Sequence, residues 1–441
     1  MMQIRDISPA GVFVLVFAGV LAGGWLFQAW LLPRTPWHAG HGLMAGGDWI
    51  TFFEQAQRLA AQIRSEGWSA WTVRFDGQWP ASLMGAAFAF TGWEKPLVVL
   101  PVYAATYALA ALALHGVARR LGLKGGFALA GLAVLAFPST VLIWGQPHKD
   151  AFALAGIALL AWAWSIAVLG EERRRWLAVT AGVYSAFTLM WLPRPYLAEV
   201  TVVALAAGSG AFLFFGPERW RAAKRGLLFL LLAAIAVWSL KAVEKVEKVE
   251  KVEKVEKVEL CHTWRPEFYL PFVHEKVGSM VCYRHGFIHG HPGQGGSLDH
   301  DRLLTNYWEL LRYLPRAAFL AVVSPAPRLC ALFGNCETTS PGGEVKRLVA
   351  AMEMLIFYAA LAGCWVWLVN GERDRRAFAA ALFLCAWAIA IFYVLTSPNE
   401  GTLYRARFPE LALWWLLGVW GWSGQCAAAC KALTRTEKCR S

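Results

Sequence analysis

Apolar runs about 20 residues long recur along the whole chain, and they constrain its fold more than any other feature. A helix of that length crosses the hydrocarbon core of a bilayer. The chain has 441 residues, of which 57% are hydrophobic and only 16% are charged. Soluble domains carry about 25% charged residues. The sequence therefore predicts an all-α polytopic membrane protein rather than a soluble protein with one anchor.

About ten segments have the length and composition of a membrane span. The first is too long for the apolar core of a signal peptide, so we expect it to remain as a helix. The apolar segment 81–92 is too short to span, so we expect an interfacial or re-entrant piece. The apolar segment 314–334 contains prolines and arginines, so we expect it to lie along the outer surface or to dip into it. The predicted spans are 11–32, 97–118, 126–144, 151–169, 177–192, 197–215, 226–241, 347–369, 377–396 and 409–424.

The basic residues set the expected orientation. They gather in alternate short loops, such as "EERRR" and "GERDRR", and in the C-terminal tail. This bias is typical of the cytoplasmic side, so both termini are expected in the cytoplasm. The net charge of +12 follows this pattern, which argues against nucleic acid as a partner. The predicted parts are a module 1–241 of about seven spans with an outer loop 33–96, an outer segment 242–346, and a module 347–441 of about three spans.

The outer segment begins with a tripeptide repeat, "VEKVEKVEKVEKVEKVE", over 243–259. Its Glu-to-Lys pairs four residues apart favour a helix. A period of three does not match 3.6 residues per turn, so the valines form no single apolar stripe. We predict a solvated helical extension of the seventh span. A coiled-coil partner site is the alternative.

Asp48 stands near the start of a stretch, 46–63, that has apolar residues at helical spacing. This pattern predicts an amphipathic helix in the membrane interface. Asp48 would then be the N-cap of that helix, or a surface carboxylate that takes a proton from an incoming hydroxyl. The two roles are compatible, and the stretch alone does not choose between them.

Several cations stand in short outer loops, where the orientation rule predicts few. Arginine matches phosphate oxygens bidentately, and a lipid phosphate would lie at this depth. The sequence therefore predicts a phosphate site at the outer ends of the spans, with three further polar side chains as accessory candidates. The cations are Lys149, Arg194, Arg405 and Arg407, and the accessory candidates are Glu54, His148 and Asp150.

The cysteines of the outer segment predict a disulfide, whereas its histidines do not predict a metal site. Four cysteines, Cys261, Cys282, Cys330 and Cys336, predict at least one disulfide, with Cys261–Cys282 and Cys330–Cys336 as the local pairings. The histidines of "YRHGFIHGH" lack a carboxylate or cysteine to complete a tight ligand pattern. No metal and no cofactor is predicted.

Three stretches together resemble the lipid-phosphosugar-dependent glycosyltransferases of the GT-C fold, especially the bacterial branch similar to protein mannosyltransferases and aminoarabinose transferases. They are the acid before the amphipathic helix, the stretch from Pro80 to Gly92, and "FPSTVLIWGQPHKDAFALAGIALLAWAW" over 137–164. The likeness covers about the first 200 residues by pattern and the rest by topology. In that family a catalytic acid lies in the first outer loop, where Asp48 stands. Many members have two adjacent acids there, whereas Trp49 follows Asp48 and the next acid is Glu54.

The resemblance implies transfer of a sugar from a polyprenyl-phosphate donor to a glycan, lipid or protein acceptor at the outer face. Asp48 would deprotonate the acceptor, and the cations would stabilise the departing phosphate. One alternative is a polysaccharide polymerase or ligase that acts on lipid-linked glycans. Another is a non-enzymatic lipid or solute transporter, although no repeat between halves supports it.

Overall fold

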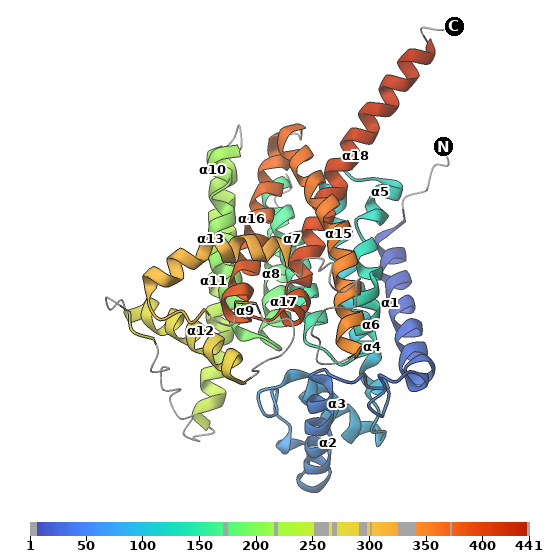
Figure 1. Cartoon of the computed structure of the whole chain (residues 1–441), viewed down its shortest axis with the longest axis vertical. Helices are drawn as coiled ribbons and strands as arrows, with labels where there is room; N and C mark the ends of the chain where they lie inside the picture. Colours follow the sequence, from blue (N-terminus) through green and yellow to red (C-terminus); the bar gives the residue numbers. More distant parts are fainter. Residues whose placement is uncertain are drawn as a thin grey trace.

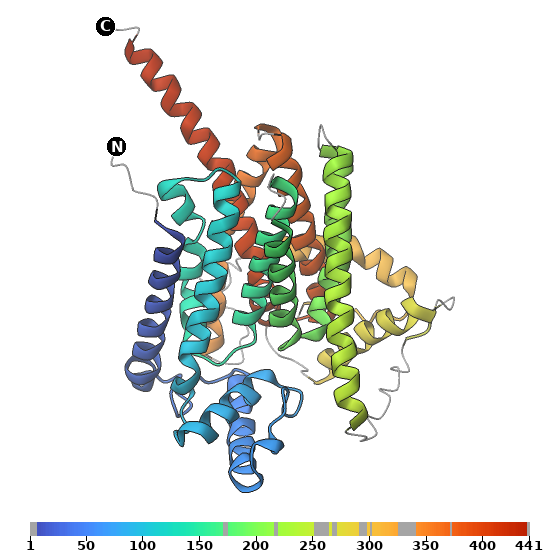
Figure 2. The same ribbon diagram turned by 180° about the vertical axis from the view of Figure 1, so that it is seen from behind.

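The computed structural model describes residues 7–170, 175–215, 219–250, 264–266, 271–290, 298–299, 302–324, 341–370 and 373–438. Within these ranges the regular secondary structure is helical, and turns and loops, with two isolated β-bridges, connect the helices. Figures 1 and 2 show the long helices side by side in one bundle, with α2 and α3 outside one end of it. The elements are α1 (Pro9–Leu26), η1 (Phe27–Leu31), η2 (Leu32–Arg34), α2 (Trp49–Glu66), η3 (Trp68–Ala70), α3 (Trp79–Thr91), η4 (Pro96–Val99), α4 (Leu100–Arg120), α5 (Gly125–Ala130), η5 (Ala133–Ala136), α6 (Pro138–Trp144), α7 (Asp150–Leu169), α8 (Arg175–Trp191), α9 (Pro195–Ser209), α10 (Phe212–Phe215), α11 (Arg219–Glu250), α12 (Pro271–Gly290), α13 (Tyr307–Val323), α15 (Pro341–Asn370), α16 (Arg373–Thr396), α17 (Glu400–Ala406) and α18 (Phe408–Lys438).

Among the described residues, 7 helical segments are long and apolar enough to cross a membrane. Each coincides with a span that the sequence predicts. The chain therefore has the helices of a multi-pass α-helical membrane protein. The segments are Pro9–Arg34, Pro96–Arg120, Asp150–Leu169, Pro195–Phe214, Trp220–Glu244, Leu348–Val369 and Arg375–Thr396.

The other three predicted spans are not among these seven. The segments 177–192 and 409–424 are helical, as α8 and the first part of α18. The segment 126–144, by contrast, is divided among α5, η5 and α6, so the prediction of one continuous helix is wrong there. Pro138 accounts for one break, because proline has no N–H to continue a helix from the preceding turn. Non-helical backbone at membrane depth is tolerated where protein covers it, and Val134 and Leu135 of η5 are buried.

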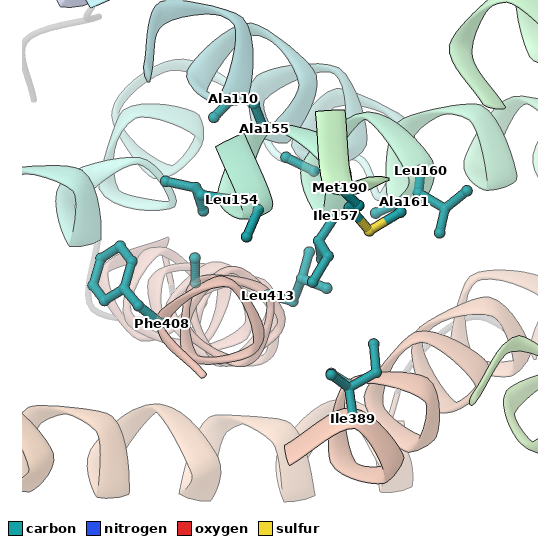
Figure 3. Packing of buried hydrophobic residues seen from close by; sticks show 14 of the residues in the cluster. Ala110, Leu154, Ala155, Ile157, Leu160, Ala161, Met190, Ile389, Phe408 and Leu413 are labelled. Atoms are coloured by element: carbon teal, nitrogen blue, oxygen red, sulfur yellow. The ribbon is translucent and has the colours of Figure 1, made fainter. Parts of the chain in front are cut away.

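Helix α7 is the centre of the bundle. In its apolar window 89% of the residues are buried, and it packs against α4, α8, α16 and α18. Figure 3 shows Ile157 of α7 facing Leu413 of α18, with Ile389 of α16 beyond them. The start of α7, which carries Asp150, is therefore fixed from several sides.

Helix α2 confirms the predicted apolar face but not its predicted location. The predicted apolar residues are buried against protein, mainly α3, and the rings of Phe53 and Phe88 are 5.7 Å apart. The face is thus covered by α3, which contains most of the segment 81–92, instead of lying in the membrane interface. The buried residues of this face are Trp49, Phe52, Phe53, Ala56, Ala60 and Ile63.

Helix α13 holds the first part of the apolar segment 314–334. It packs on α16, where the Trp387 indole donates to the Ala318 carbonyl at 3.0 Å. Ala317 and Ala321 are fully buried. The segment therefore lies against the bundle as far as Val323, and residues 325–334 lie outside the described ranges.

Helix α11 confirms the helical extension for the first part of the repeat. It continues without a break from the seventh predicted span to Glu250, and residues 251–259 lie outside the described ranges. Arg74, in the loop between α2 and α3, forms an ion pair with Glu244 at 3.1 Å. The extension therefore contacts this loop through a charged residue of the repeat.

One of the four cysteines of the outer segment lies within the described residues. Cys282, on α12, takes part in a disulfide bond, as the even number of outer cysteines predicts. Cys261, Cys330 and Cys336 lie outside the described ranges, so both local pairings remain predictions.

Candidate functional site

Asp150 is the centre of a charged cluster at the end of the bundle next to α2. Its carboxylate is buried in the first turn of α7, where the helix dipole favours a negative charge. Asp150 Oδ1 lies 2.5 Å from Arg194 Nη2, and Oδ2 lies 2.6 Å from His148 Nδ1. Arg405 Nε is 3.7 Å from the same Oδ2. Three segments therefore converge on one carboxylate.

His148 contributes a buried imidazole ring to this cluster. Its side chain is buried, with the Trp49 ring 5.8 Å away at a steep angle. Burial lowers the pKa of His148, and the neighbouring Asp150 acts in the opposite direction without reversing the shift. The Asp150 backbone N–H also donates to His148 Nδ1 at 3.1 Å, so this ring nitrogen faces both the backbone and the carboxylate of Asp150.

Arg194 is directed by the prolines on either side of it. Pro195 begins α9, and Arg194 precedes it with extended φ of −150°, as expected for a residue before proline. Burial opposes the charge of this guanidinium, yet Asp150 beside it holds the pKa of Arg194 well above its usual range. Arg194 and Asp150 therefore form a buried, mutually neutralising pair.

Arg405 connects the buried pair with the loop that precedes α2. Its Nη2 donates to Asp48 Oδ2 at 3.2 Å. The Asp48 side chain is 59% exposed, whereas that of Arg405 is 22% exposed. Asp48 makes no side-chain cap bond, although its residue immediately precedes α2. The capping role is therefore not realised, and the carboxylate faces Arg405.

Lys149 is near both carboxylate–arginine pairs, since the charges of Arg194, Asp48, Asp150 and Arg405 all act on it. Its Nζ is 5.2 Å from the centre of the Phe52 ring, a cation–π contact. Burial lowers the pKa of Lys149 to about 8, and repulsion from Arg194 adds to the shift. The ion pairs of the described residues give Lys149 no carboxylate within 4.0 Å. It is the cation of the cluster that is least engaged by protein.

Arg407 does not belong to this cluster, contrary to the prediction. It is fully buried, and it donates to the backbone carbonyls of Leu320 (3.4 Å) and Ala321 and to Met354 Sδ (3.6 Å). Residues two apart in a helix point to different sides, and α17 ends between Arg405 and Arg407. The second arginine therefore fastens α13 to the bundle.

Glu54 is also separate from the cluster. It lies six residues after Asp48, on the exposed face of α2. The hydrogen bonds and ion pairs of the described residues do not connect it with Asp48, Lys149 or Asp150. Of the predicted site residues, six come together and two do not. The six are Asp48, His148, Lys149, Asp150, Arg194 and Arg405.

Gln146 is a residue of the site that the sequence interpretation missed. Its Oε1 accepts from the backbone N–H of Met44 at 3.0 Å, and its Nε2 donates to the Gly42 carbonyl at 3.1 Å. The Met44 carbonyl in turn accepts from the Trp49 indole. Gln146 therefore joins the turn before Asp150 to the loop before Asp48. The glutamine in "GQP" was a signal of a polar residue in an apolar region, but no spacing rule connects it with partners about 100 residues away.

No family model matches the sequence, and no curated protein matches it. The class that the fold and the cluster define is a helical multi-pass membrane protein with a charged site where its first loop meets the bundle. The chemistry of that site is therefore inferred from its own residues.

Proposed function

We propose that the protein is a membrane glycosyltransferase that takes a sugar from a polyprenyl-phosphate donor. The observation that supports this best is an exposed carboxylate, Asp48, beside two cations, Lys149 and Arg405, at one end of an apolar bundle. A lipid-linked phosphate needs an apolar path for its chain and cations at the surface. The bias of basic residues toward the loops at the opposite end supports an outer location for this end of the bundle.

In the proposed reaction the acceptor hydroxyl attacks the anomeric carbon of the donor. The new carbon–oxygen bond forms as the bond to the phosphate oxygen breaks, and the phosphate leaves with the bonding electrons. Asp48 takes the hydroxyl proton as general base. Lys149 and Arg405 stabilise the charge that develops on the phosphate.

Arg405 would change partners in this reaction. In the free protein it lies 3.2 Å from Asp48. A phosphate with two negative oxygens competes for the same guanidinium, and its binding would release the Asp48 carboxylate to accept a proton. The Asp150–Arg194 pair would hold its place beneath, because both groups are already neutralised by each other.

The test uses purified protein in lipid nanodiscs with radiolabelled polyprenyl-phosphate sugars and a panel of membrane acceptors. Wild-type protein should transfer label, and Asp48→Asn should reduce the rate by about 10²–10⁴-fold. Asn keeps the shape of the side chain, and polyprenyl-phosphate binding should persist. Glu66→Gln, an exposed change at the other end of α2, is the matched control and should retain wild-type transfer.

Two results would contradict the proposal. One is near-normal transfer by Asp48→Asn, which would remove Asp48 from the mechanism. The other is the absence of polyprenyl-phosphate binding by wild-type protein in the same nanodiscs. Transfer of whole lipid-linked glycan chains, instead of single sugars, would redirect the assignment to a polymerase or ligase.

A further inference from the structure

Glu353 joins two segments of the site that are far apart in the sequence. It lies on α15 and is 3% exposed. Its Oε1 accepts from the backbone N–H of Ser139 at 2.7 Å, and its Oε2 accepts from the Ser139 hydroxyl at 2.6 Å. The Tyr404 hydroxyl donates to the same Oε2. One carboxylate therefore takes three hydrogen bonds from two different segments.

Both partners are close to the cations of the site along the chain. Ser139 is the second residue of α6, which leads through Gly145 into the turn that bears Lys149. Tyr404 directly precedes Arg405 on α17. Glu353 thus forms hydrogen bonds with α6, the helix before Lys149, and with the residue next to Arg405.

The break in the predicted span explains why a carboxylate is needed there. The first N–H groups of a helix have no partner within it, and Ser139 at the start of α6 is half-buried where α6 packs on α15. Glu353 supplies the missing acceptor from α15. Its negative charge also suits the dipole at the start of α6. An ionisable group in a membrane span is costly unless it is fully hydrogen-bonded. Packing of Phe137 on Phe357, with ring centres 5.5 Å apart, holds the same two segments together.

We propose that Glu353 is a positioning residue that sets the separation between Lys149 and Arg405, so that both cations reach one phosphate. The proposal deepens the proposed function and rests on it for the identity of the anion. Glu353 itself touches no substrate. Its effect reaches the site through α6 on one side and α17 on the other.

The experiment combines hydrogen exchange with binding of polyprenyl phosphate, both in nanodiscs. Glu353→Ala should raise amide exchange about tenfold in 138–144 and in 400–406, and it should weaken polyprenyl-phosphate binding about tenfold. Glu353→Gln should restore both properties in large part. Its amide oxygen can accept from the Ser139 N–H, and the two hydroxyls can turn to accept from its NH₂ group.

Two milder variants separate the two segments and keep the test decisive if Glu353→Ala does not fold. Tyr404→Phe should raise exchange in 400–406 alone, whereas Ser139→Ala should raise it in 138–144 alone. The proposal would be overturned if Tyr404→Phe left amide exchange in 400–406 unchanged, or if Ser139→Ala left it unchanged in 138–144. So would wild-type binding affinity in a folded Glu353→Ala protein. If wild-type protein binds no polyprenyl phosphate, the proposed function fails, and the exchange results alone decide whether Glu353 couples the segments.

Discussion

The two carboxylate–arginine pairs of the site share their chemistry but differ in exposure. The side chains of Asp150 and Arg194 are 6% and 10% exposed, whereas those of Asp48 and Arg405 are 59% and 22% exposed. A buried pair is costly to break, because each partner would leave an uncompensated charge. An exposed pair contributes little to stability and exchanges partners easily. The difference in exposure supports a structural role for the inner pair and, under the proposed function, a role in phosphate binding and proton transfer for the outer pair.

The largest expected effect is the loss of stability when the inner pair is broken. Arg194→Ala should lower the free energy of unfolding by about 3–5 kcal/mol, because Asp150 would keep a buried charge without its main partner. The measurement is chemical denaturation in detergent micelles. The double variant Asp150→Asn with Arg194→Ala removes both charges and should recover part of the loss. A single variant as stable as the double would show that the pair is not coupled.

Breaking the outer pair should affect phosphate binding more than stability. Arg405→Ala should change the free energy of unfolding by at most about 1 kcal/mol, as for other exposed pairs. It should weaken polyprenyl-phosphate binding about 10–100-fold, because a charge-assisted contact to phosphate is lost. Titration with polyprenyl phosphate in nanodiscs measures the second effect. Strong destabilisation with unchanged affinity would reverse the assigned roles of the two pairs.

Arg407 provides an internal control for Arg405. Arg407→Ala would leave the Ala321 and Leu320 carbonyls without this donor, so it should cost about 1–3 kcal/mol of stability. Polyprenyl-phosphate affinity in the folded protein should stay near that of the wild type, since the side chain lies away from the cluster. Loss of affinity equal to that of Arg405→Ala would place Arg407 in the binding site after all.

The contrast between these two arginines shows where sequence reasoning was sufficient and where it was not. Local hydropathy and helical period correctly predicted the apolar face of α2 and the helices around Asp150, because both signals act within a few turns. They did not separate Arg405 from Arg407, since the end of α17 between them depends on tertiary packing. The pattern also missed the break at Pro138, because the acceptor that allows it, Glu353, is 214 residues from Ser139.

Gln146 and Asp48 illustrate the same limit within the site. The partners of Gln146 lie 104 and 102 residues away, at Gly42 and Met44, so no spacing rule in the sequence connects them. For Asp48 the sequence left a cap and a reactive carboxylate open. The backbone decides against the cap, because Asp48 has helical φ and ψ of −62° and −19°, whereas a capping residue has extended geometry.

The smallest predicted effect is a pH dependence that arises from Lys149, the cation near both pairs. Its pKa is lowered to about 8, first by burial and then by Arg194. Lys149 therefore loses its charge as the pH rises through about 8, and its protonated fraction falls roughly tenfold between pH 7 and pH 9. Polyprenyl-phosphate affinity should decrease over this window, by up to about tenfold.

For stability the sign is opposite: the unfolded chain holds this proton up to its ordinary pKa, so unfolding becomes less favourable as the pH rises above 8. Lys149→Arg keeps the charge at every pH of the window, and its affinity should stay level from pH 7 to pH 9. An equal decrease in the Lys149→Arg and wild-type proteins would assign the titration to another group and separate Lys149 from phosphate binding.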